Sequence, residues 1–211
     1  MEKENQTQNL ILLIGIFLTI YFVYELFILP SGLLRAQTNV TVTATVTTTV
    51  TCNPATTTTN FGTIDASAVY TSSPNVITTV SCNPAAGCNV TIRDQGSGTQ
   101  PGLWNSTASY LIPSPNASFS ATATLVAGTE GYGIQATTTS AGSGGTLSLN
   151  SRYVQTGNTV GGLTTTTIQL ASSTEPVANR EIVVTHKVAI SGLTRAGNYQ
   201  DIITYSCASN F

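Results

Sequence analysis

Charged residues are scarce in this 211-residue sequence, where Asp, Glu, Lys and Arg together make up only 8% of the chain. Seven basic residues stand against nine acidic residues, which gives a formal net charge of −2. A protein that binds nucleic acid needs a basic surface to replace the counterions of the phosphate groups. The composition therefore excludes nucleic acid as the expected partner.

Histidine is nearly absent too, because His186 is the only one. It alternates with Ile182, Val184, Val188 and Ile190, so we expect it on the apolar face of a strand, half-buried and hydrogen-bonded to its surroundings. There is no GxSxG motif to present a serine nucleophile. The segment CNPAAGC is too wide for a CxxC zinc knuckle. The sequence thus predicts no enzyme and no metal site.

Acidic residues that could form a catalytic pair are few and scattered along the chain. Glycoside hydrolysis needs two carboxyl groups on either side of the same bond. The candidates are Asp65, Asp94, Glu130, Glu175, Glu181 and Asp201. We expect these side chains at the surface or in turns, and we expect no catalytic residue and no cofactor.

What the sequence does contain begins with an apolar run from Leu10 to Leu29. About 20 residues, at about 1.5 Å each along a helix, would just span a bilayer. The uninterrupted part, Leu10 to Tyr24, is as short as the hydrophobic region of a signal peptide, and Leu34-Arg35-Ala36 offers a cleavage site. We expect residues 1–36 to be a cleaved signal peptide, with a retained membrane anchor through residues 10–29 as the alternative.

After residue 36 the chain is rich in threonine and β-branched residues that alternate with period two. The first run, NVTVTATVTTTVTC at residues 39–52, places its apolar side chains on one face and threonines on the other. Similar runs occupy residues 75–82, 88–94, 132–139, 165–172, 180–191 and 199–207. Proline and glycine turns separate the runs, and no helical period appears. Residues 37–211 are therefore predicted to form one all-β domain, an antiparallel immunoglobulin-like β-sandwich.

All four cysteines lie on the apolar faces of their predicted strands. An even number in an exported chain favours two disulfides among Cys52, Cys82, Cys88 and Cys207, with three possible connectivities. The similar segments TTVTCNPA and TTVSCNPA, at residues 48–55 and 78–85, suggest that two cysteines end neighbouring strands. We therefore favour Cys52–Cys82 with Cys88–Cys207, and keep Cys82–Cys88 with Cys52–Cys207 as the alternative.

A family resemblance is carried by the two ends of this domain. A strand ending in Cys52, NFGTID at residues 60–65, a strand ending in Cys82, and AGNYQDIITY at residues 196–205 resemble the spore coat protein U-like domain and, more distantly, chaperone–usher pilins. The resemblance implies an immunoglobulin-like sandwich that lacks its last strand and receives a donor strand from the next subunit of a fibre. Residues 130–136 and 157–163 are also similar to small threonine-rich exported bacterial proteins without an assigned activity.

Assembly depends on how the edge beside the last predicted strand is covered. An open edge with apolar alternation is a template for another strand. The run from Val40 to Val50 is the obvious donor, and it could close its own sheet or add to a neighbouring copy. We expect self-closure, because this run leads directly into Cys52.

The predicted function is that of a non-enzymatic, exported structural protein of the cell surface, either a single displayed domain or a subunit of a surface fibre. The alternative is an adhesin or glycan-binding module that contacts its ligand through Trp104 and Tyr110. An aromatic ring in a loop rich in Pro, Gly and Asn can stack on a sugar. A tryptophan in such a loop can equally close the end of a sandwich.

Overall fold

The computed structural model describes residues 2–28, 38–115 and 121–210, and within the helix the side chains of residues 5–25. The chain divides into two compact units, Met1–Thr45 and Val46–Phe211, which are treated separately. The first contains the helix α1 (Glu2–Ile28), and the second contains only strands and loops. An all-β domain preceded by an apolar N-terminal helix is therefore confirmed.

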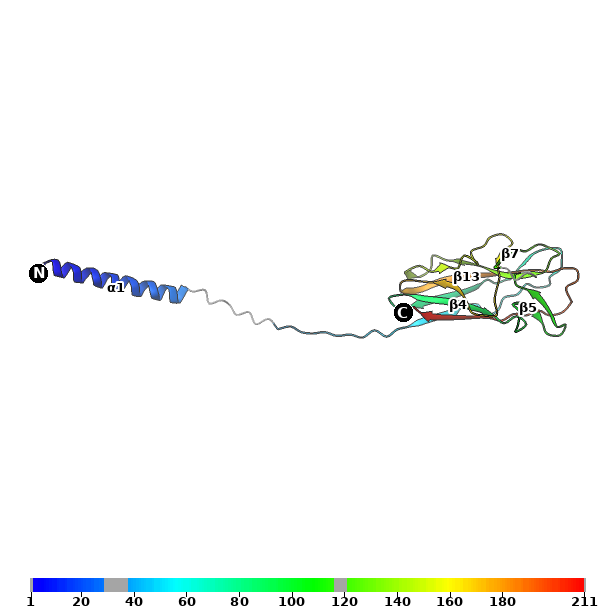
Figure 1. Ribbon diagram of the computed structural model, residues 1–211, viewed down its shortest axis with the longest axis horizontal. Coiled ribbons are helices and arrows are strands. Elements are labelled where there is room, and N and C mark those ends of the chain that lie inside the picture. The colour runs from blue at the N-terminus through cyan, green and yellow to red at the C-terminus, as the bar shows by residue number, and fades with distance from the viewer. Residues whose placement is uncertain (1, 29–37, 116–120, 211) are drawn as a thin grey trace. The chain divides into compact units, whose positions relative to one another are not determined.

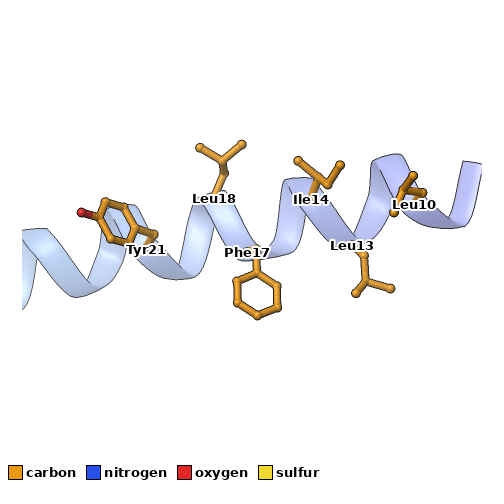
Figure 2. Close-up of a pocket in the computed structure, with 6 residues that line it drawn as sticks. All are labelled: Leu10, Leu13, Ile14, Phe17, Leu18 and Tyr21. Carbon is orange, nitrogen blue, oxygen red and sulfur yellow. The ribbon is translucent and has the colours of Figure 1, made fainter.

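Helix α1 is apolar on all sides. Figure 2 shows one apolar stripe of the helix, formed by Leu10, Leu13, Ile14, Phe17, Leu18 and Tyr21. Ile11, Leu12, Gly15 and Ile16 lie together on another face, which is apolar as well. The hydroxyl of Thr19, within the apolar stretch, donates to the main-chain carbonyl of Ile16 at 2.9 Å. Residues Asn5–Glu25 are long and apolar enough to cross a bilayer, with a mean hydropathy of 1.8. A signal sequence meets the same criteria, so both expectations for this segment stay open.

The larger sheet of the second unit is antiparallel and has β13 at its centre (Figure 1). Its strands follow the order β1 (Val50–Pro54), β3 (Val76–Cys82), β13 (Val177–Ala189), β8 (Gly131–Thr138), β11 (Thr159–Gly161) and β7 (Thr122–Thr124). Two short strands, β2 (Tyr70–Thr71) and β9 (Ser143–Gly144), also pair with β13.

The smaller sheet has four antiparallel strands, and β14 at its edge is red in Figure 1. The order is β10 (Ser148–Leu149), β12 (Ile168–Ser172), β4 (Cys88–Asp94) and β14 (Ile203–Ser209). A separate two-stranded sheet pairs β5 (Gly102–Asn105) with β6 (Tyr110–Pro113).

The core of the domain is built from alternate residues of both sheets. On β3 every second side chain is buried, and β4 repeats this pattern with its inward face. Val80 of the larger sheet and Val90 and Ile92 of the smaller sheet belong to the same cluster and are fully buried. Period-two alternation thus located both strands to within one residue, because only one face of each strand packs into the core.

The expected strand at residues 39–52 is wrong over most of its length. Strand β1 begins only at Val50, and residues 38–49 lie in no strand. Their apolar side chains are exposed, with Val40, Val42 and Val46 at 83%, 88% and 84% of full accessibility. Alternation gives a segment the capacity to pair, but a strand needs a neighbour for its hydrogen bonds, so the expected self-closure is also wrong.

The favoured disulfide pairing is wrong, and the alternative is the one that forms. Cys52 is bonded to Cys207 and Cys82 to Cys88, with Cα atoms 5.9 and 6.3 Å apart. The strands that carry Cys52 and Cys82 are indeed neighbours, but their register pairs Cys52 with Val80. Cys52 therefore reaches across to β14 of the other sheet, while Cys82 closes a short turn to Cys88.

Candidate functional site

Two edge strands meet at one margin of the domain. Among the described residues, strand β1 pairs only with β3 and β14 pairs only with β4, while the Cys52–Cys207 disulfide joins β1 to β14. We call the unpaired edges of β1 and β14 the open margin. The inward side chains of β14, Ile203 and Tyr205, are only half-buried, whereas their neighbour on β4, Ile92, is fully buried. The open margin thus leaves part of the core incompletely covered.

A pocket of about 450 Å³ lies between the two sheets beside β14. This volume falls within the range of small-molecule sites. Its walls include Phe61, Leu103, Tyr132, His186, Asp201 and Tyr205. The threonines at residues 56–59, Asn60 and Gln200 also line it, so the pocket combines aromatic and apolar groups with hydroxyl and amide groups and one carboxyl group.

That carboxyl group belongs to a buried pair. Asp94 ends β4, and its Oδ2 accepts a hydrogen bond from the Gly102 amide at 3.1 Å. Asp201 precedes β14, and its Oδ1 accepts from the Gly96 amide at 3.2 Å. The two carboxyl groups lie within hydrogen-bonding reach of each other. Burial, reinforced by the nearby charge of Asp201, raises the pKa of Asp94 to about 9, and burial also raises the pKa of Asp201.

The expectation that both residues are at the surface or in turns is therefore wrong. Asp94 continues the buried face that contains Val90 and Ile92, and Asp201 continues the face of Ile203 and Tyr205. Period-two alternation, extended by one step beyond each apolar run, would have placed both carboxyls inside. Because the two carboxyl groups lie within hydrogen-bonding reach of each other, no sugar ring can lie between them, as glycoside hydrolysis would require.

His186 and Tyr132 form the wall of the pocket on the larger sheet. Their rings are stacked, with centroids 6.3 Å apart and planes inclined by 13°. His186 lies on the apolar face, as expected, but it is almost fully buried rather than half-buried, and its Nδ1 has no hydrogen-bond partner among the described residues. Burial lowers the pKa of His186 to about 4, so the imidazole is neutral at pH 7. Burial also raises the pKa of Tyr132, whose hydroxyl lies within reach of Asp201.

The two aromatic residues of the glycan hypothesis lie in the two-stranded sheet. Trp104 of β5 is opposite Leu111, and Tyr110 of β6 is opposite Asn105. Because successive side chains alternate between faces, Trp104 and Tyr110 lie on opposite faces of this sheet. The Tyr110 hydroxyl donates to Glu130 at 2.7 Å, and the Arg195 guanidinium lies 5.3 Å from the centre of the Tyr110 ring. The two rings do not form one stacking platform.

Within residues 2–28, 38–115 and 121–210, no cluster of three or more His, Cys, Asp or Glu side chains could hold a metal ion. No protein family model matches the sequence, and no curated protein is significantly similar to it.

Proposed function

We propose that this protein is an exported, non-enzymatic structural protein of the cell surface whose copies join by strand addition. Residues 39–49 of one copy would add to the open margin of the next copy. The proposal is carried by the coexistence, in the described part of the chain, of an alternating segment outside any strand and a core strand, β14, with one unpaired edge.

Export is supported by the N-terminal helix and the disulfides. Helix α1 is long and apolar enough for a signal sequence or an anchor. All four cysteines are paired, and disulfides persist mainly in oxidising locations outside the cytosol. Both features fit a domain displayed beyond the membrane.

The donor segment has the right pattern and length. In an extended conformation Val40, Val42, Ala44 and Val46 point to one side, so this face could enter a half-covered core. At about 3.3 Å per residue, residues 39–49 extend about 36 Å, which is longer than the seven-residue strand β14. Full exposure of these valines in one copy is costly in water, which favours their burial against another.

The acceptor edge is supported by β14 itself. One side of the strand has no pairing partner in the described ranges, and its alternating side chains are half-buried. Such an edge binds an added strand through main-chain hydrogen bonds, with pockets for alternate side chains providing specificity. The glycan-binding alternative has less support, because Trp104 and Tyr110 would have to act singly.

Electron microscopy of cells that make the protein tests this proposal. Substituting Val40, Val42 and Val46 together by threonine removes the apolar face and keeps the β-branched shape. The matched control replaces Thr41, Thr43 and Thr45 by serine on the opposite face. We expect filaments from the native protein and the control, and folded, disulfide-bonded subunits without filaments from the valine variant. Absence of filaments from the native protein, or unchanged filaments from the valine variant, would refute strand addition.

A further inference from the structure

We propose that Asp94 and Asp201 share a single proton, and that this proton makes the domain more stable in acid than in alkali. The hydrogen bond that it provides connects the end of β4 to the start of β14. The proposal concerns the folded domain alone and does not depend on assembly.

The hydrogen bonds around the two carboxyl groups account for all but two of the oxygens. Asp94 Oδ2 is satisfied by the Gly102 amide, and Asp201 Oδ1 by the Gly96 amide. Asp94 Oδ1 and Asp201 Oδ2 are buried and make no hydrogen bond in the described part of the chain, although the Tyr132 hydroxyl lies close to Asp201. A buried carboxylate oxygen without a donor is costly, and two of them in neighbouring carboxyl groups are costlier still. One proton between Asp94 Oδ1 and Asp201 Oδ2 makes one of these oxygens a hydrogen-bond donor and the other its acceptor.

The surroundings offer no other source of positive charge. The groups that face the pair are Tyr132 on β8, His186 on β13, Tyr205 on β14 and the Tyr153 side chain. Burial raises the pKa of each tyrosine and lowers that of His186, so all four are neutral near pH 7. In the described part of the chain, no Lys or Arg side chain is bonded to either carboxyl. Two carboxyls in this position cannot both ionise without strong repulsion.

The position of the pair makes the proton structurally important. Next to it, the Gln95 amide donates to the Ile202 carbonyl at 3.0 Å, and the Asp94 amide donates to the Thr164 carbonyl at 3.0 Å. The pair therefore lies where the end of β4, the beginning of β5 and the approach to β14 come together. Loss of the proton would place two like charges at this junction.

The direction of the pH effect follows from counting protons. In the unfolded chain both carboxyls are ionised above about pH 4, whereas the folded domain keeps one proton up to about pH 9. Since the unfolded state binds fewer protons, the free energy of unfolding falls as the pH rises through this window. His186 acts in the opposite direction between about pH 4 and 6.5, so the fall is unopposed only above about pH 6.5.

The test is denaturant unfolding of the full chain in detergent between pH 6.5 and 9. For the native protein we expect the folding equilibrium constant to fall by up to about tenfold per pH unit. Asp94→Asn and Asp201→Asn each supply a permanent amide donor to the remaining carboxylate, so each variant should fold and lose this pH dependence. In the double variant two amide NH₂ groups face each other, and it should be less stable than either single variant. Asp65→Asn, at an exposed turn, is the control and should keep the native slope.

Infrared spectroscopy reads the proton directly. At pH 7 the native protein should show the carbonyl stretch of one protonated carboxyl group, and both single variants should lack it. If both carboxyls are ionised instead, this band is absent and the native protein shows no slope above pH 6.5. In that case, each Asp→Asn substitution removes the repulsion between two charged carboxylates. The double variant is then no less stable than either single variant. Any of these three results would overturn the proposal.

Discussion

Gly87 lies against the main-chain carbonyl of Ser173, so closely that a Cβ atom at residue 87 would overlap the carbonyl oxygen. The contact fixes the turn between Cys82 and Cys88 against the end of β12. Gly87 has a φ of +73°, and its amide donates to the Pro84 carbonyl at 2.9 Å. Both the backbone conformation and the space at this position therefore require glycine.

Gly87→Ala should destabilise the domain more than Gly98→Ala does. Gly98 also has a positive φ, +89°, but nothing lies within 4 Å of its Cβ position. Gly98→Ala should therefore lower the free energy of unfolding only by the cost of holding an alanine in the left-handed backbone conformation, about 1–2 kcal/mol. Denaturant unfolding of both variants measures the difference. Equal losses would show that the Ser173 contact does not constrain the turn.

The two disulfides should differ in their contribution to stability. Cys52–Cys207 links residues 155 positions apart, whereas Cys82–Cys88 links residues six apart. The chain-entropy estimate gives about 5 kcal/mol for the long loop and about 2 kcal/mol for the short loop. Replacing each pair by alanine, followed by denaturant unfolding, measures both values.

Peptide mapping without reduction provides the accompanying check of connectivity. It should recover a linked peptide pair that contains Cys52 and Cys207. Recovery of Cys52 linked to Cys82 would contradict the structure. A larger loss of stability for the Cys82–Cys88 variant would contradict the entropic account instead.

The sequence predicted where strands lie better than how they pair. Alternation located β3 and β4 because half of their side chains enter the core, and this signal is local. The Cys52 pairing could not be found in this way, since a two-residue offset in register leaves the alternation of both strands unchanged. The prediction of a strand at residues 39–49 failed for a related reason. An alternating pattern shows that a segment is able to form a strand, but a strand also requires a neighbouring strand to pair with.

His186 should reduce stability in acid. Its pKa is lowered to about 4 by burial, so between about pH 4 and 6.5 the unfolded state binds a proton that the folded state does not. His186 thus lowers the free energy of unfolding as the pH falls through this window. His186→Phe keeps an aromatic ring beside Tyr132 and removes the titration.

Thermal unfolding of the His186→Phe variant and the native protein across this range measures the effect. The difference in melting temperature between variant and native protein should shift in favour of the variant as the pH falls from 6.5 towards 4. Above pH 7 the two proteins should show the same pH dependence. A difference that does not change between pH 4 and 6.5 would mean that His186 is protonated in the folded state as readily as in the unfolded state.

The candidate site was only partly accessible from sequence. Asp94 and Asp201 are 107 positions apart, and their contact depends on the pairing of β4 with β14, which no local pattern contains. Their inward orientation was accessible, because each extends an apolar alternation by one step of two residues. Trp104 and Tyr110 are close in sequence, but only the β5–β6 register shows that they face opposite sides.

The most direct test of strand addition is photo-crosslinking from within the proposed donor segment. A photoreactive phenylalanine analogue replaces Ala44, which shares the valine face, and the chain is co-expressed with an isotopically labelled copy. We predict crosslinks from residue 44 of one copy to the β14 peptide of the other, and no such product from the same analogue at exposed Leu193. Crosslinks found only within one copy, or only to peptides distant from β1 and β14, would contradict strand addition.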